Sequence, residues 1–97
     1  MDYPCLVEVR FDHQFEYYLY VMELPGDREA RIEAEGEGLR SLRYLRLHRV
    51  KEGDLLVALG KVNRLTEDFN WLSWVEVVLP NGRRGMLAEV SLYEVEL

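Results

Sequence analysis

The sequence predicts a mainly β domain, and two observations support that prediction. Apolar residues alternate with other residues over 5–11 and 71–79, which is the period-two pattern of a β-strand. Asn81-Gly82 then separates residues 71–79 from a second apolar run at 86–92, and Asn-Gly between apolar runs is the strongest short-range hairpin signal. We therefore expect a hairpin whose tryptophans anchor the core.

The first quarter of the chain predicts two strands joined by a turn at residues 12–14. Residues 5–11 form the first strand, and residues 15–24 form a longer one that is dense in aromatic and β-branched residues. One face of the second strand bears Phe15, Tyr17, Leu19 and Val21, and the other bears Tyr18, Tyr20, Met22 and Leu24. Because both faces are largely apolar, we expect both to be covered.

Residues 28–36 fit two structures. Their composition favours a helix, with Asp27 as N-cap and Gly36 just past the end. Their apolar residues alternate with charged ones, however, and would not gather on one side of a helix. We favour a strand that pairs back onto residues 15–24.

The middle of the chain predicts two further strands. Residues 39–43 form a turn or short helix, followed by a strand that ends at residue 50. A tight turn at 51–54 allows Gly53 to adopt positive φ, and residues 55–59 form a short buried strand. Residues 60–70 form the longest connection.

Composition and charge limit the classes of function. The chain has 97 residues, which suit one domain, and a net charge of −6, which argues against binding bulk nucleic acid. Cys5 is the single cysteine, so an internal disulfide is impossible, and we expect a reduced, cytoplasmic protein in which Cys5 is a small core residue. No apolar run approaches the roughly 18 residues of a membrane span. Arg greatly outnumbers Lys, a usage that suits a thermophile.

From about Leu47 onward the chain resembles an SH3-like barrel of the bacterial kind. The residues that support the resemblance are the Gly53-Asp54 turn before a core strand, the Trp74–Val77 strand, the Asn81–Gly85 hairpin with its closing glycine, and the small strand Met86-Leu87. The resemblance implies a small SH3-like barrel over residues 39–97. Residues 1–38 would then form an N-terminal β-hairpin extension.

The resemblance does not extend to the family's usual ligand site. Members that bind proline-rich peptides follow the closing glycine with an aromatic residue, an aliphatic residue and a proline, and then a tyrosine. This chain has Met86, Leu87, Ala88 and Ser91 at those positions. Because polyproline recognition needs an aromatic groove, we expect no binding of proline-rich peptides.

The sequence offers no pattern that indicates catalysis, a cofactor or a metal. His13 and His48 lie in different segments, far in sequence from Cys5, so no metal-ligand spacing is present. Glu33, Glu35 and Glu37 are close together, but a solvated edge explains three carboxylates better than acid–base chemistry. We expect a protein without catalytic residues.

Two groups of residues are candidates for binding. Arg40, Arg43, Arg46 and Arg49 lie in a segment, 38–51, with five bases and no acids. They are a candidate anion-binding set, although a spacing of three spreads them over both faces of a strand. Tyr18, Tyr20 and Met22 are a candidate partner-binding face, because aromatics and Met are enriched at interface cores. The alternative for this face is burial by the C-terminal half.

These observations predict a non-catalytic protein-interaction module or a small subunit of a larger assembly, with a protein partner or a second copy of the chain bound through the Tyr18 face. The second hypothesis is a nucleic-acid accessory protein that uses the basic segment 40–51.

Overall fold

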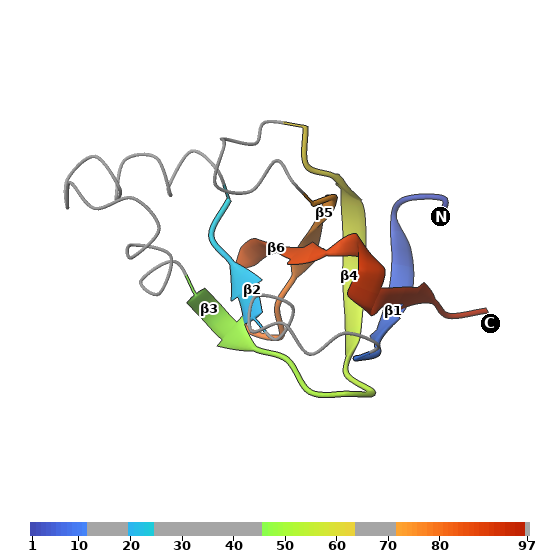
Figure 1. Ribbon diagram of the computed structural model, residues 1–97, viewed down its shortest axis with the longest axis horizontal. Helices are drawn as coiled ribbons and strands as arrows, with labels where there is room; N and C mark the ends of the chain where they lie inside the picture. The colour runs from blue at the N-terminus through green and yellow to red at the C-terminus, as the bar shows by residue number, and fades with distance from the viewer. Residues whose placement is uncertain (12–19, 25–45, 64–71, 97) are drawn as a thin grey trace, which may run out of the picture.

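The computed structural model describes residues 1–11, 20–24, 46–63 and 72–96, and these form an antiparallel sheet (Figure 1). Its strands are β1 (Cys5–Val9), β2 (Tyr20–Met22), β3 (Arg46–Arg49), β4 (Leu55–Lys61), β5 (Trp74–Val78), β6 (Arg84–Ala88) and β7 (Leu92–Glu94), with a 3₁₀ turn, η3 (Glu89–Ser91), between the last two. The order is β3-β2-β6-β5-β4-β1-β7, so the sheet is open, with β3 and β7 at its edges. The prediction of a mainly β protein is confirmed.

The predicted Asn-Gly hairpin joins β5 to β6. The amide of Gly82 donates to the carbonyl of Leu79 at 2.9 Å, and the amide of Leu79 donates to the carbonyl of Arg83 at 2.8 Å. Gly82 has φ +85°, whereas Asn81 has negative φ. Pro80 holds φ near −65° at the second position of the turn, which fits a type I turn followed by a glycine bulge rather than a two-residue hairpin loop.

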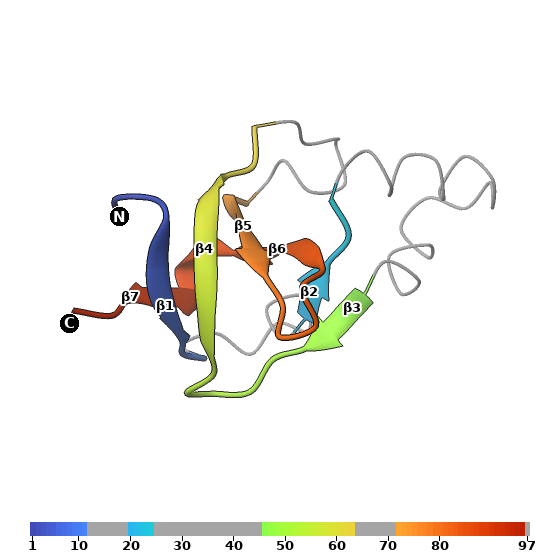
Figure 2. The ribbon, with the colours of Figure 1, turned by 180° about the vertical axis from the view of Figure 1, so that it is seen from behind.

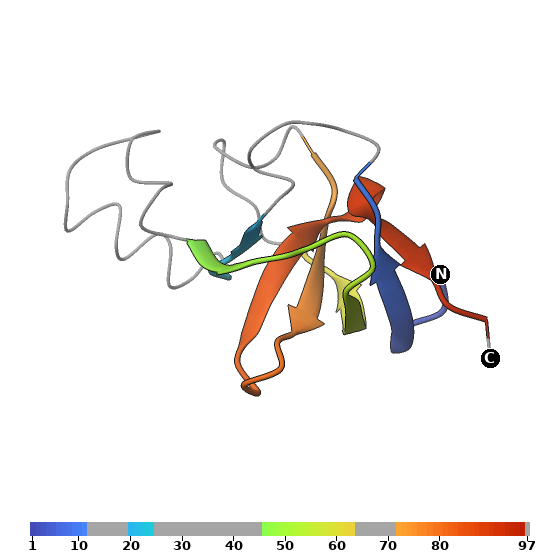
Figure 3. The same cartoon turned by 90° about the horizontal axis from the view of Figure 1, so that it is seen from below.

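The second strand of that hairpin is shorter than the apolar run 86–92 predicts. β6 ends at Ala88, and η3 then turns the chain so that β7 pairs with β1 instead of continuing beside β5. The first and last strands, β1 and β7, consequently lie side by side (Figure 3).

The structure differs from the expected N-terminal extension over residues 1–38, because β1 lies inside the sheet between β4 and β7. Val7 and Val9 are fully buried, and β1 pairs with β4 on one side and with β7 on the other. Backbone bonds join Val9 to the turn before β4: Gly53 donates to the Val9 carbonyl at 2.8 Å, and Val9 donates to the Asp54 carbonyl at 2.9 Å. The predicted positive φ of Gly53 is confirmed at +88°.

Apolar side chains cover both faces of the sheet where β2, β6 and β5 pair. Val21, Val75 and Leu87 belong to a large cluster with side chains of β1 and β4, the inner cluster. Met22, Trp74, Met86 and Ala88 form a second cluster on the opposite face, the outer cluster. Val21 and Met22 are adjacent in sequence and both are fully buried. For these residues the prediction that both faces of 15–24 are covered is therefore confirmed.

β4 corrects the prediction of a short buried strand over residues 55–59, because only one face of β4 is buried. Leu56 and Ala58 are buried in the inner cluster, but Leu55 and Val57 are 57% and 43% exposed. Because alternate side chains of a strand point to opposite faces, the inner cluster can bury one set and leave the other outside.

Several predictions fall on residues outside the described ranges. These include the strand or helix at 28–36, the turn at 39–43, Trp71 and most of the 60–70 connection. In the part of the chain that the structure describes, no helix has the length and apolar character needed to cross a membrane.

Candidate functional site

The predicted Tyr18, Tyr20 and Met22 face is not a free surface at Met22. This side chain is fully buried in the outer cluster, and β2 pairs with β6 at Met22 and Met86. Tyr20 is half-buried against the same cluster, and Tyr18 lies outside the described residues. The expectation that Met22 contacts a partner is therefore corrected, because burial inside the chain removes its side chain from the surface.

The pairing of β3 with β2 brings two of the four candidate arginines to one face. Tyr20 pairs with Arg49 and Met22 pairs with Arg46, with a register shift at the extra residue Leu47. Tyr20 and Met22 share a face, so their directly opposite partners share it too. On a regular strand, residues three apart such as Arg46 and Arg49 point to opposite faces. The extra residue at the register shift brings both onto the same face.

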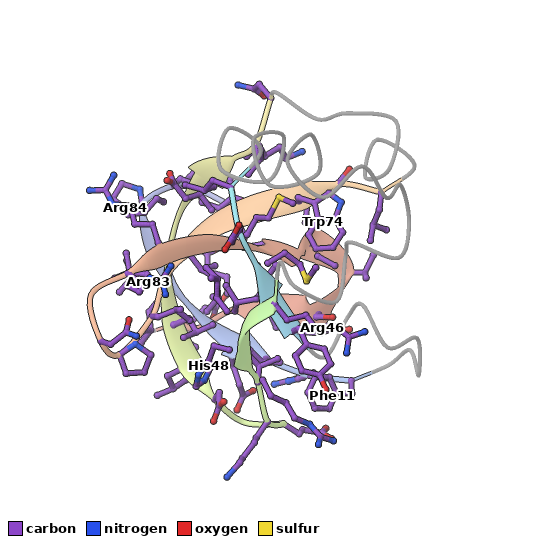
Figure 4. The ribbon with its side chains drawn as sticks, turned by 90° about the vertical axis from the view of Figure 1, so that its left-hand side faces the viewer. Phe11, Arg46, His48, Trp74, Arg83 and Arg84 are labelled. Atoms are coloured by element: carbon purple, nitrogen blue, oxygen red, sulfur yellow. The ribbon has the colours of Figure 1, made fainter. Side chains whose placement is uncertain are left out.

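Those two arginines differ in surroundings. The Arg46 guanidinium lies 4.4 Å from the centroid of the Tyr20 ring, in a cation–π contact. Figure 4 shows Arg46 and His48 leaving β3 on different sides, with Arg46 toward Phe11. Arg49 is exposed at the end of β3. Arg40 and Arg43 lie outside the described residues.

Four aliphatic side chains form a surface strip that the sequence did not single out. Val57 pairs with Leu6 of β1 on one side and with Val78 of β5 on the other, and Leu55 lies two residues before Val57 on the same face of β4. Leu55 and Val57 are exposed, and Leu6 and Val78 are half-buried. We call these four residues the aliphatic patch; β1, β4 and β5 lie side by side beneath it (Figure 2).

Charged residues border the aliphatic patch on both sides. Glu8 of β1 pairs with Leu55, and Arg84 of β6 pairs with Val78. Glu8 also accepts a hydrogen bond from Arg10 Nε at 2.9 Å, with both side chains partly exposed. An apolar centre with a charged rim is the usual composition of a protein-binding surface.

A pocket of about 280 Å³ adjoins the aliphatic patch. We call it the basic pocket; it is lined by His48, Arg49, Lys51, Asp54, Leu55, Leu56 and Pro80. Its lining comes from the end of β3, the connection from β3 to β4, the start of β4, and Pro80 in the turn between β5 and β6. Leu55 belongs to both the pocket and the patch, so the two features form one continuous surface.

Cys5 has the properties of a structural thiol. Its side chain is partly buried against the inner cluster. Burial raises the pKa of the Cys5 thiol above its ordinary value of 9.0, and the carboxylates of Glu94 and Asp2 add to the rise, while the N-terminal amino group opposes it. The thiolate is the nucleophile, so a raised pKa makes Cys5 less reactive at neutral pH than an ordinary cysteine.

We expect alkylation of Cys5 by iodoacetamide to be slow below pH 9. Because its pKa is raised, the thiolate fraction at any lower pH is smaller than for an ordinary cysteine, and the rate should increase with pH through the folded-state pKa. The same chain unfolded in urea is the control and should titrate near the ordinary value. A folded protein that reacts faster than the unfolded one at pH 7 would contradict this prediction.

Burial also raises the pKa of the Tyr3 hydroxyl above 10.0, assisted by the negative charge of Glu89 and, more weakly, by Cys5 and Glu94. Both Cys5 and Tyr3 thus favour the protonated form when the protein is folded, so their stabilising contribution is present at neutral pH and is lost in alkaline solution.

Within residues 1–11, 20–24, 46–63 and 72–96, no three His, Cys, Asp or Glu side chains come together as metal ligands.

Comparisons with protein-family models, with curated proteins and with solved structures find no significant match to this chain.

Proposed function

We propose that this protein is a non-catalytic interaction module, or a small subunit of a larger assembly, that binds its partner through the aliphatic patch. The observation that supports this most directly is the exposure of Leu55 and Val57, which are 57% and 43% accessible on one face of β4. Single exposed aliphatic residues are common on protein surfaces, but a contiguous set across three paired strands is not. The absence of cysteine pairs is compatible with a cytoplasmic setting.

We further propose that the fold is an SH3-like barrel. In support, the Gly53-Asp54 turn precedes β4, Trp74 lies on β5 between β4 and β6, and Gly85 follows the β5–β6 turn. The barrel would also include β1 and β7, which lie on the far side of β4. This assigns to the barrel a strand that the sequence resemblance left outside.

The same proposal excludes proline-rich peptides as ligands at the family's usual position. Met86, Leu87, Ala88 and Ser91 occupy the places of the family's ligand-contacting segment, and all four are buried. Side chains that pack the core have no surface left to form an aromatic groove. The aliphatic patch is on a different part of the sheet.

Replacing Val57 with Asp is the sharpest test of the patch. Covering an exposed Val is worth up to about 1.5–3 kcal/mol, and a buried unpaired carboxylate adds a further penalty. We therefore expect Val57→Asp to weaken partner binding at least about tenfold. The measurement is co-purification of partners from the native host with mass spectrometry, followed by titration of each recurrent partner and by sedimentation for self-association.

Val90→Asp is the matched control, because Val90 is 39% exposed and lies in η3, which contributes no residue to the aliphatic patch. It introduces the same charge in the same residue type and should leave partner binding unchanged. Thermal unfolding of both variants verifies that the fold persists. An equal loss of partner binding in Val57→Asp and Val90→Asp, or no loss of binding in either, would show that the aliphatic patch is not the contact surface.

A nucleic-acid accessory role is the second candidate, and one observation favours it. The register shift in β3 places Arg46 and Arg49 on one face, where a phosphate could contact both. The net charge of −6 and the stacking of Arg46 on Tyr20 weigh against it. Its signature would be oligonucleotide affinity that falls steeply as salt concentration rises.

A further inference from the structure

We infer that the basic pocket binds a carboxylate of the partner, so that the partner segment presents an acidic residue next to aliphatic ones. This inference rests on the proposed function, since Leu55 lines both the basic pocket and the aliphatic patch. An extended segment that covers Val57 and Leu55 would continue into the pocket at one end of β4.

The walls of the pocket combine cationic groups with apolar ones. Arg49 and Lys51 supply a guanidinium and an ammonium group, and His48 supplies an imidazole. Leu55, Leu56 and Pro80 provide the apolar part of the lining. A guanidinium fork and an ammonium group match the two oxygens of a carboxylate, and the aliphatic walls suit the methylenes that carry it.

Asp54 also lines the pocket, but its carboxylate has a structural role. Asp54 Oδ2 accepts a hydrogen bond from the backbone amide of Lys51 at 2.8 Å, and the Asp54 amide donates to the Lys51 carbonyl at 3.0 Å. These bonds close the 51–54 turn upon itself. They direct one carboxylate oxygen to the protein's own backbone, which reduces its repulsion of an incoming anion.

The backbone that bears the cationic side chains is held on both sides. Val50, between Arg49 and Lys51, is buried in the inner cluster. The Gly53 amide binds the Val9 carbonyl at 2.8 Å, which fixes the turn to β1. Arg49 and Lys51 therefore extend from a fixed backbone, and less entropy is lost when they bind an anion than in a free loop.

Size and lining favour a side-chain carboxylate over nucleic acid. About 280 Å³ lies just below the range of roughly 300–1,000 Å³ typical of small-molecule sites, and it suits one or two side chains. Single-stranded nucleic acid is bound by charged grooves with exposed aromatic platforms, whereas the described lining contains no Phe, Tyr or Trp. Exposed Leu55 beside Arg49 instead matches a segment of alternating aliphatic and acidic residues.

The test is a titration of the full ¹⁵N-labelled chain with the peptide acetyl-Leu-Glu-Leu-Glu-amide, followed by chemical-shift changes of backbone amides. The neutral peptide acetyl-Leu-Gln-Leu-Gln-amide and a twelve-nucleotide oligothymidine are the parallel probes. We expect the acidic peptide to shift amides at 48–51 and 54–57. We also expect it to bind at least about fivefold more tightly than the neutral one, since hydrogen bonds to charged groups exceed neutral ones.

Two substitutions, made singly and together, and one matched control complete the experiment. Arg49→Gln combined with Lys51→Gln should reduce affinity for the acidic peptide about tenfold or more, while the neutral peptide is unaffected. Lys61→Gln is the control for Lys51→Gln. Lys61 is exposed at the other end of β4, where it pairs with Glu89 at 3.5 Å, and its loss should change affinity less than about twofold.

The outcomes separate this inference from the proposed function. Equal binding of acidic and neutral peptides, with shifts confined to the aliphatic patch, would overturn the carboxylate site and leave the patch standing. Equal effects of Lys51→Gln and Lys61→Gln would also overturn it, since the response would then reflect net charge. Preferential, salt-sensitive binding of oligothymidine, or no shift with any probe, would overturn it as well. In each case the comparison of Val57→Asp with Val90→Asp decides the proposed function independently.

Discussion

Trp74→Ala is expected to lower the free energy of unfolding by about 3–5 kcal/mol. Trp74 is 1% exposed and packs with Met22 and Met86, and it pairs with Ala88 across β5 and β6. Removal of the indole leaves a cavity among side chains that are themselves fixed by strand pairing, so they cannot close around it. Urea denaturation with a two-state fit measures the loss.

Trp74→Phe is the control for this prediction. It keeps an aromatic ring in the outer cluster and should cost clearly less than the alanine variant, because the residual cavity is smaller. A loss of less than about 1 kcal/mol in Trp74→Ala would show that the indole is not a core side chain. The outer cluster would then not hold β2 against β5 and β6.

Gly85→Ala is expected to destabilise the protein by about 3 kcal/mol although it adds one methyl group. A Cβ at this position would lie 2.5 Å from Val21 Cγ1, 2.7 Å from the Met22 carbonyl oxygen and 3.1 Å from Leu47 Cδ1. The carbonyl belongs to the backbone of β2, so it cannot move without displacing the strand. Close approach of β2 to β6 therefore requires glycine at position 85.

Gly60→Ala provides the matched control, since a Cβ at Gly60 would meet no atom within 4 Å. Gly60 also lies in a strand, at a register shift between β4 and β5. We expect its stability to change by less than about 1 kcal/mol, in either direction. Chemical denaturation of the two variants side by side makes the comparison. Similar losses at both positions would indicate a general intolerance of the sheet to alanine, and the close packing of β2 on Gly85 would not be its cause.

Trp74→Ala and Gly85→Ala together would also test whether β2 is part of the core or part of a partner-binding surface. The sequence predicts the face of Tyr18, Tyr20 and Met22 as a partner-binding surface, with burial by the C-terminal half as the alternative. Met22 packs on Trp74 and Met86, and its carbonyl lies against Gly85. Large losses of stability in both variants would support an internal role for Met22 and remove the last reason to place it at an interface.

The sequence by itself determined the features that depend only on residues close together along the chain. Alternation predicts strands over 5–11 and 71–79, and the structure has β1 and β5 within those ranges. The Asn81-Gly82 pair predicts the hairpin, and Gly53 predicts the positive φ of its turn. The burial of Trp74 can also be predicted, because a large apolar residue in the middle of an apolar strand is seldom exposed to solvent. Each of these depends on local geometry, which a single stretch of chain specifies.

Only the tertiary structure decided which face of a strand meets the core. In residues 55–58 both alternating sets are apolar, so periodicity cannot distinguish Leu55 and Val57, which are exposed, from Leu56 and Ala58, which are buried. The candidate site was missed for that reason.

Pairing between segments distant in sequence decided where β1 lies in the sheet and which arginines share a face. The position of β1 depends on β4 and β7, which follow it by some fifty and eighty-five residues. The shared face of Arg46 and Arg49 depends on the register with β2, in which Leu47 is an extra residue. A sequence pattern cannot reveal such a shift, because register is set by the partner strand and by the side chains that both must bury.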